Sequence, residues 1–239
     1  MNQTVKKVLR IILGTLLTLI ILSIGTVILY RYIPVPITPL MVTRYITEGT
    51  AINYKWTPIE KISPDLSLAV ISSEDNLFME HDGFDFKAIE KARAEAKAGI
   101  RFRGASTITQ QTAKNLFLWH GRTWLRKGLE AYFTVLLELL WDKKDIMEAY
   151  LNCIEMGDGI YGAAAVAKIH FNTTPDKLTR SQCALIAATL PNPRRFNSAK
   201  PSKYMLKREQ DILKIMKLIG KIDLEAKPIQ KKQQSKKKQ

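Results

Sequence analysis

Two acidic side chains stand together where an apolar stretch of the chain gives way to a turn. Glu74 and Asp75 end this stretch, and the turn-forming residues His81, Asp82 and Gly83 follow a few positions later. A carboxylate beside apolar residues can be tuned to accept or donate a proton near neutral pH. The spacing therefore favours a catalytic acid or base at a helix–loop junction, although a solvated acidic loop has the same pattern.

A second cluster, residues 104–115, is dense in hydroxyl and amide side chains. Where such a cluster begins a helix, its side chains can donate hydrogen bonds to sugar hydroxyls or to an anion, and the helix dipole favours negative charge there. A capped helix with a polar face is the simpler explanation of the same residues.

Basic residues follow the polar cluster. Lys114, Arg122, Arg126 and Lys127 lie close together in the chain, and Glu130 stands four positions after Arg126. Arginine can bind a pyrophosphate through its bidentate fork, and lysine can bind it as a point charge. Alternatively, Arg126 and Glu130 form an exposed helix pair worth about 0.3 kcal/mol. The residues alone leave these two interpretations equal.

The first element around these residues is an apolar N-terminal segment. Residues 11–30 carry no charged side chain, and as a helix they would span about 30 Å, the thickness of one hydrocarbon core. A cleaved signal peptide would have a shorter apolar region and a small-x-small site, whereas this segment runs into Arg31 and Pro34. We therefore expect an uncleaved membrane anchor, with residues 1–10 as a basic cytoplasmic tail. The flanking charges favour this orientation only slightly.

The sequence of the remaining chain predicts one mainly α-helical domain at residues 61–222. It shows no series of segments with the alternating apolar and polar pattern of β-strands. Three prolines make residues 31–60 a stiff connector, whose apolar part, residues 39–46, can rest on the bilayer surface. The lysine-rich residues 223–239 should be disordered. Ser63 with Pro64, Thr123 and Asp142 predict three helix starts, and Thr179 with Gln182 matches a capping box. Two further helices are expected over residues 86–98 and 202–222, the last from its apolar spacing.

Composition narrows the class of protein. The 239 residues include 37 Lys and Arg against 22 Asp and Glu, a net charge of +15, and 46% of them are apolar. Most of the excess charge lies in the two tails, so it is a weak argument for nucleic acid and suits an anionic membrane equally well. Cys153 and Cys183 stand in apolar helical patterns and are expected to be buried thiols. The three histidines lack the spacing of a zinc site.

Four motifs occur in a fixed order along the chain. They are Glu74-Asp75-x-x-Phe78-x-x-His81-x-Gly83, Gly104-Ala105-Ser106-Thr107-Ile108-Thr109-Gln110-Gln111-x-x-Lys114-Asn115, Arg126-Lys127-x-x-Glu130 and Lys143-x-x-Ile146-Met147-Glu148-x-Tyr150-Leu151-Asn152. Together they resemble the motifs of peptidoglycan glycosyltransferases, and the match runs from about residue 66 to residue 193. The residues after it are too few for a transpeptidase domain, so the resemblance is to the monofunctional, biosynthetic members.

The resemblance implies a lysozyme-like, mainly helical fold with one N-terminal transmembrane helix, and an enzyme that polymerises lipid II at the outer face of the inner membrane. It implies a cytoplasmic N-terminus, a periplasmic domain, and β-1,4 bonds formed with inversion. The donor would be the growing glycan on undecaprenyl pyrophosphate, and the acceptor would be lipid II. Expected partners are lipid II, the nascent glycan, membrane lipids and proteins of cell-wall synthesis or division, but no nucleic acid.

The same resemblance assigns roles to single residues. Glu74 would be the general base that takes the proton of the acceptor 4-hydroxyl, and Lys114 and Arg122 would hold the donor pyrophosphate. Pyrophosphate is a good anionic leaving group, so stabilising its charge matters more than protonating it, unlike in glycosidases. Glu130, the second acidic residue expected in the catalytic site, would then orient basic groups, substrate or a divalent ion. Mg²⁺ or Mn²⁺ is optional, and no protein metal site or obligatory cofactor is expected.

The other expected site residues fall into three groups. Ser106, Thr107, Gln110 and Gln111 would line the cleft, Asn115, Arg126 and Lys127 would support it, and Asp75 and His81 would position Glu74. Lys143, Glu148, Tyr150 and Asn152 are expected mainly as scaffold.

Four positions depart from the family pattern. Ala164 and Gln182 stand where glutamate is common, and His170 and Asn172 stand where an aromatic residue and a glycine are usual; Asn172 can still adopt the left-handed conformation that glycine favours. Two other functions remain open. A membrane-bound lytic enzyme of lysozyme type would share the fold and Glu74, but Lys114 and Arg122 suit a pyrophosphate instead. A non-catalytic membrane scaffold would not need the acidic residues and the polar cleft together.

Overall fold

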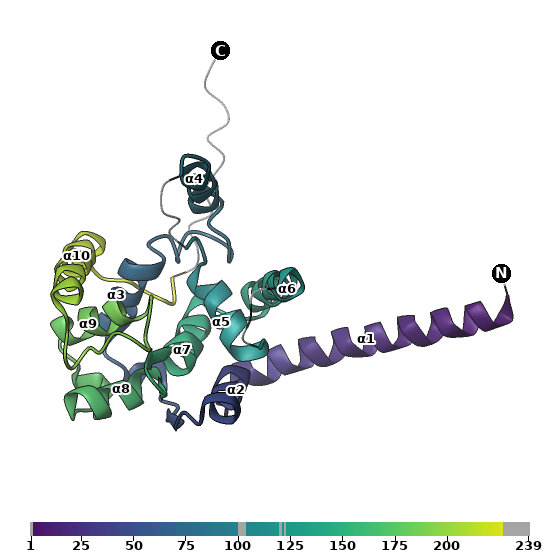
Figure 1. Ribbon diagram of the computed structural model, residues 1–239, viewed down its shortest axis with the longest axis horizontal. Coiled ribbons are helices and arrows are strands. Elements are labelled where there is room, and N and C mark those ends of the chain that lie inside the picture. Colours follow the sequence, from purple (N-terminus) through teal and green to yellow (C-terminus); the bar gives the residue numbers. More distant parts are fainter. Residues whose placement is uncertain (1, 100–103, 120, 122, 227–239) are drawn as a thin grey trace, which may run out of the picture.

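The computed structural model describes residues 2–99, 104–119, 121 and 123–226. A helical body stands at one end of a long helix that projects away from it (Figure 1). The elements follow in the order α1 (Gln3–Tyr32), α2 (Pro39–Glu48), β1 (Asn53–Tyr54), η1 (Ile59–Lys61), α3 (Pro64–Glu74), α4 (Phe86–Lys97), α5 (Ile108–Phe117), α6 (Trp124–Leu140), α7 (Lys143–Cys153), β2 (Glu155–Gly157), β3 (Ile160–Tyr161), α8 (Gly162–Phe171), η2 (Pro175–Lys177), α9 (Arg180–Thr189) and α10 (Lys203–Ile219).

The projecting helix α1 contains the predicted anchor. Its most apolar window has a mean hydropathy of 2.6, and within the described part of the chain it is the one helix long and apolar enough to cross a membrane. The helix is longer than the expected residues 11–30 at both ends, because no helix-breaking residue stands before Pro34.

The end of α1 belongs to the folded body. Val27 is fully buried, and its carbonyl oxygen accepts a hydrogen bond of 2.9 Å from Trp141 Nε1. Arg31 pairs with Asp142 at 2.5 Å and with Asp145 at 3.0 Å, at the start of α7. These contacts fix the last turns of α1 against the junction between α6 and α7.

Helix α2 lies in the connector, beside the base of α1 (Figure 1). Thr38 caps it, and Gly49 ends it with a φ of 64°. Met41 is fully buried, whereas Tyr45 and Ile46 are 61% and 73% exposed. The expectation that the whole apolar stretch 39–46 can rest on a bilayer is therefore wrong for Met41, which the core needs, and only the face with Tyr45 and Ile46 remains open.

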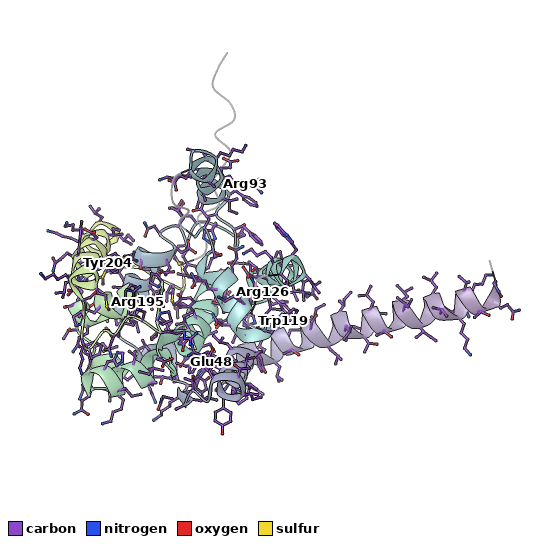
Figure 2. All side chains as sticks on the ribbon, viewed as in Figure 1. Glu48, Arg93, Trp119, Arg126, Arg195 and Tyr204 are labelled. Carbon is purple, nitrogen blue, oxygen red and sulfur yellow. The ribbon has the colours of Figure 1, made fainter. Side chains whose placement is uncertain are left out.

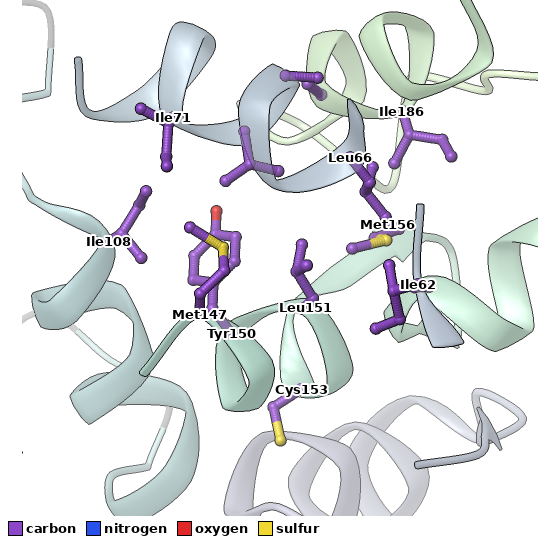
Figure 3. Close-up of a cluster of buried hydrophobic side chains, with 14 of the residues drawn as sticks. Ile62, Leu66, Ile71, Ile108, Met147, Tyr150, Leu151, Cys153, Met156 and Ile186 are labelled. Atoms are coloured by element: carbon purple, nitrogen blue, oxygen red, sulfur yellow. The ribbon is translucent and has the colours of Figure 1, made fainter. Parts of the chain in front are cut away.

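The core lies where α3, α5, α7, α9 and α10 meet, and Figure 3 shows part of it. Residues 66–72 of α3 are all buried, so this helix is enclosed on every side. Tyr150 from α7 packs among Ile71, Ile108 and Met147 (Figure 3). Cys153 and Cys183 are buried free thiols, as predicted.

Most helix starts agree with the sequence. Thr123 and Ser202 cap α6 and α10, and Thr179 forms a capping box at α9. The small sheet was not predicted: its strand order is β1-β3-β2, with β1 parallel and β2 antiparallel to β3. Strands of two or three residues are too short to show an alternating pattern.

Gly162, between β3 and α8, offers a test of this packing. It has a φ of 78°, and a Cβ there would overlap the backbone carbonyl of Asn152. Gly162→Ala should lower the free energy of unfolding by about 3 kcal/mol, because the left-handed conformation and the backbone overlap both disfavour alanine. Thermal unfolding in detergent, followed by circular dichroism, measures this.

Gly128 is the matched control for that substitution. It lies within α6, and a Cβ there would have no neighbour within 4 Å. Gly128→Ala should raise stability by about 0.5–1 kcal/mol, since alanine favours the helix. An unfolding midpoint for Gly162→Ala equal to that of the unaltered protein would contradict the described packing.

Candidate active site

A groove of about 620 Å³ opens between α2, α5, the start of α6 and the loop after α9. Gln111, Lys114 and Asn115 of α5 line one side, Arg126 of α6 adds a cation, and Arg44 of α2 lines the opposite side with Glu155. Glu48, Trp119 and Arg126, which also line it, are labelled in Figure 2. The polar cluster and part of the basic cluster thus meet in one concave site.

Glu74 is the last residue of α3 and is half-buried. Its Oε2 accepts a hydrogen bond of 3.1 Å from Gln111 Nε2, and its Oε1 accepts one of 3.1 Å from the Ser73 hydroxyl. The Gln111 amide is oriented in turn by Tyr150, whose hydroxyl donates to Gln111 Oε1 at 3.2 Å. Burial raises the pKa of Tyr150 well above its ordinary value, so its phenol remains a donor.

Asp75 organises the loop next to Glu74. It is buried, and its Oδ1 lies 2.9 Å from His81 Nε2, while its Oδ2 accepts a hydrogen bond of 3.0 Å from the Ile108 backbone N–H. Lys143 donates to the His81 carbonyl oxygen at 2.7 Å. Asp75 therefore ties the end of α3 to the start of α5, which places Glu74 beside Gln111.

Lys114 stands three residues after Gln111 on α5, so the two side chains share one face of the helix. Gln111 therefore connects Glu74, which is not among the residues that line the groove, with Lys114, which lines it. The side chain of Lys114 is exposed in the groove, and partial desolvation by its surroundings lowers its pKa. Arg126 and Lys127 lower the pKa further, and Glu130 opposes them. Lys114 has no hydrogen-bond partner among the described residues, so it is a cation prepared for an anion.

Glu130 is buried behind this wall of the groove. Its Oε2 accepts a hydrogen bond of 2.8 Å from Arg126, and its Oε1 pairs with Lys127. The interpretation of Arg126 and Glu130 as an exposed helix pair is therefore wrong. Both carboxylate oxygens are engaged by cations, so Glu130 is better placed to hold Arg126 at the groove than to act as a ligand for a divalent ion.

Several predicted cleft residues have other positions. Thr107 and Gln110 are buried and form a capping box at the start of α5, with Thr107 also donating to the Gly83 carbonyl oxygen at 2.7 Å. Their hydroxyl and amide groups are thus used by the helix, which corrects the expectation that they line the cleft. Ser106 is exposed outside the residues that line the groove. Arg122 lies outside the described residues.

The scaffold residues anchor the connector. Glu148 accepts hydrogen bonds from Trp56 Nε1 at 3.1 Å and from the Ile59 N–H at 2.9 Å. Asn152 exchanges two hydrogen bonds with the Thr57 backbone. Asn172 has the left-handed conformation predicted for it, with a φ of 47°.

Sequence reasoning missed three groups near the site. Arg44 donates to Glu155 at 2.7 Å and to Asp158 at 2.7 Å, and it is buried although its stretch of sequence is apolar. Ser73 and Arg208 form a chain of hydrogen bonds to Glu74. A lone arginine inside the apolar residues 39–46 was the available signal for Arg44, whereas no local pattern points to Arg208.

This helical body joins a groove lined by basic side chains to a helix long enough to cross a membrane, an arrangement that suits a glycosyltransferase. A family model described as transglycosylase matches residues 42–217. The biosynthetic peptidoglycan transglycosylase of Bacteroides thetaiotaomicron is 56% identical over 98% of this chain and 97% of its own length. The protein of the same name from Caulobacter vibrioides is 50% identical over 89% and 93% of the two chains. The chain belongs to the transglycosylase family, whose domain has the lysozyme-like fold that the motifs predict.

Proposed function

We propose that this transglycosylase polymerises lipid II into β-1,4-linked glycan strands and releases undecaprenyl pyrophosphate. The observation that carries the proposal is the position of Gln111, which holds Glu74 by a hydrogen bond of 3.1 Å. It shares one face of α5 with Lys114, which has no hydrogen-bond partner among the described residues. Gln111 thus connects the proposed base with the wall of the groove that carries the cation. The names of the relatives support peptidoglycan as the product.

In the proposed reaction, the 4-hydroxyl of lipid II attacks the anomeric carbon of the donor glycan from the face opposite the pyrophosphate. Glu74 takes the hydroxyl proton as the new carbon–oxygen bond forms. The bond to the pyrophosphate breaks with its electron pair, and the released anion is stabilised by Lys114 and Arg126. Attack from the opposite face inverts the anomeric centre, which gives the β-linked product.

The basic wall of the groove argues against a lytic enzyme. Glycan cleavage expels a sugar hydroxyl, which usually needs a protonated carboxyl group as its acid. Glu130, the second acidic residue of the predicted catalytic pair, is held by Arg126 and Lys127. Both oxygens of Glu130 are thus engaged within the protein, and the cations suit a pyrophosphate.

The location of the site supports a lipid-linked substrate. We propose that α1 crosses the inner membrane once, with the N-terminus in the cytoplasm and the groove in the periplasm. Tyr45 and Ile46 of α2 would then contact the outer surface of the bilayer. Proteins of cell-wall synthesis or division remain proposed partners, and we propose that no cofactor is obligatory and that Mg²⁺ or Mn²⁺ is optional.

Two parallel incubations test this function. The full-length protein in detergent or liposomes is given lipid II in one reaction and finished glycan strands in the other. We expect polymer and undecaprenyl pyrophosphate from lipid II, and unchanged glycan in the second reaction. Shortened glycan would indicate a lytic enzyme, and no product in either reaction would indicate a scaffold.

A further inference from the structure

Helix α10 follows the groove-lining residues 190–194 along the chain and packs against α3 and α9, as Figure 1 shows. Ser202 caps its N-terminus, and the buried Glu209 accepts a hydrogen bond of 2.5 Å from the Ser181 hydroxyl of α9. These contacts hold the first half of α10 in place. Arg208, the residue before Glu209, is half-buried and reaches the end of α3.

The hydrogen bonds from Arg208 have a defined direction. Its Nη2 lies 3.0 Å from Ser73 Oγ, and a guanidinium can only donate, so the Ser73 oxygen is the acceptor. The hydroxyl proton of Ser73 is then free for another acceptor. Glu74 Oε1 lies 3.1 Å from Ser73 Oγ, and the Ala187 carbonyl oxygen lies 3.5 Å from it. The nearer acceptor is also a carboxylate, so this hydrogen bond is favoured.

Glu74 is therefore held from two sides. The relay from Tyr150 through Gln111 reaches Oε2, and the relay from Arg208 through Ser73 reaches Oε1. Each oxygen receives one donor from the protein and keeps lone pairs for an incoming hydroxyl. Two fixed donors on one carboxylate restrict the rotation of the side chain, as a base that must meet its substrate in one orientation requires.

A purely structural role explains Arg208 poorly. Its Nε is buried and has no hydrogen-bond partner among the described residues. A buried donor without a partner lowers stability, so an apolar side chain would serve packing better at this position. Its partly unsatisfied guanidinium is consistent with a role in the site.

We propose that Arg208 is a positioning residue that orients Glu74 through the Ser73 hydroxyl. The proposal rests on the proposed role of Glu74 as the general base. Arg208 and Ser73 act as one unit, so removing either should have the same effect on turnover as removing both.

A double-mutant cycle on the full-length protein tests this coupling. Arg208→Met and Ser73→Ala should each lower kcat for lipid II polymerisation about tenfold, the effect of losing one hydrogen bond to a charged group. The KM for lipid II should change by less than about twofold, because neither residue is among those that line the groove. The double variant should be no slower than the slower single variant, and Arg208→Lys should recover most of the loss.

Lys207→Met is the matched control, because Lys207 is the exposed neighbour of Arg208 on the same helix. It should leave kcat unchanged. Multiplying effects in the double variant, or a normal kcat for Ser73→Ala, would overturn the proposal. If Arg208→Met does not fold, Arg208→Gln takes its place in the cycle, and the Ser73→Ala result still decides.

Glu74→Gln separates this inference from the proposed function. If that variant is inactive while the Arg208 and Ser73 effects multiply, the base assignment stands and the positioning role is wrong. If Glu74→Gln retains full activity, the base assignment itself fails.

Discussion

Glu74→Gln should lower kcat for lipid II polymerisation by about a thousandfold, with little change in the folded structure. The amide oxygen can still accept a hydrogen bond from Ser73 or Gln111, so the local geometry should persist. The amide is far too weak a base to take the acceptor proton, and a positioned general base contributes about 10²–10⁴ to the rate. Continuous release of undecaprenyl pyrophosphate from lipid II measures the effect.

Glu90→Gln provides the matched control. Glu90 is an exposed residue of α4 and lies outside the groove. The same change of chemistry there should leave kcat within about twofold of normal, as expected for an exposed substitution. A Glu74→Gln enzyme that polymerises lipid II at the normal rate would show that another group takes the proton.

The second large effect should come from Lys114. Lys114→Met removes a cation of the groove while keeping a long, unbranched side chain, so kcat/KM for lipid II should fall about 10- to 100-fold. Lys91→Met, at an exposed position on α4, is the control and should change neither constant. Unchanged kinetics for Lys114→Met over a range of lipid II concentrations would argue against a pyrophosphate site at this residue.

The dependence of kcat/KM on pH tests the role of Lys114 independently. Desolvation and the neighbouring cations lower the pKa of Lys114, so its positive charge is complete below that pKa and is lost as the pH rises through it. The kcat/KM should therefore fall at a lower pH than an ordinary lysine would give. Lys114→Arg keeps its charge to higher pH, so the alkaline fall should move upward. An identical alkaline limb in both proteins would assign that limb to another group.

Local signals in the sequence predicted much of the fold. Capping residues such as Thr123 and Thr179 marked helix starts correctly, because a cap satisfies backbone groups within a few residues of itself. The strands around Asn53 and Ile160 were not predicted, because each is very short and they pair across a long stretch of sequence. Thr107 and Gln110 were expected to line the cleft, but they form a capping box. Thr179 and Gln182 have the same spacing and were correctly predicted as a capping box.

The site was predictable where its residues lie in local motifs and not where the fold brings distant residues together. Glu74, Gln111 and Lys114 are brought together by contacts between α3 and α5 that the motif order indicated. Arg208 and Arg44 reach their partners across more than a hundred residues of sequence. The contact of Arg208 with Ser73 depends on the packing of α10 against α3, and the contact of Arg44 with Glu155 depends on the position of α2 beside β2. No local sequence pattern indicates either arrangement.

The attachment of α1 to the body has a consequence for encounters between enzyme and substrate. A helix joined by a loose linker would let the domain tumble, and most collisions with a lipid-borne sugar would occur in unproductive orientations. The contacts of Val27 and Arg31 with the α6–α7 junction remove that freedom when the protein folds. The orientational entropy is then lost once, during folding, and not again at each catalytic encounter.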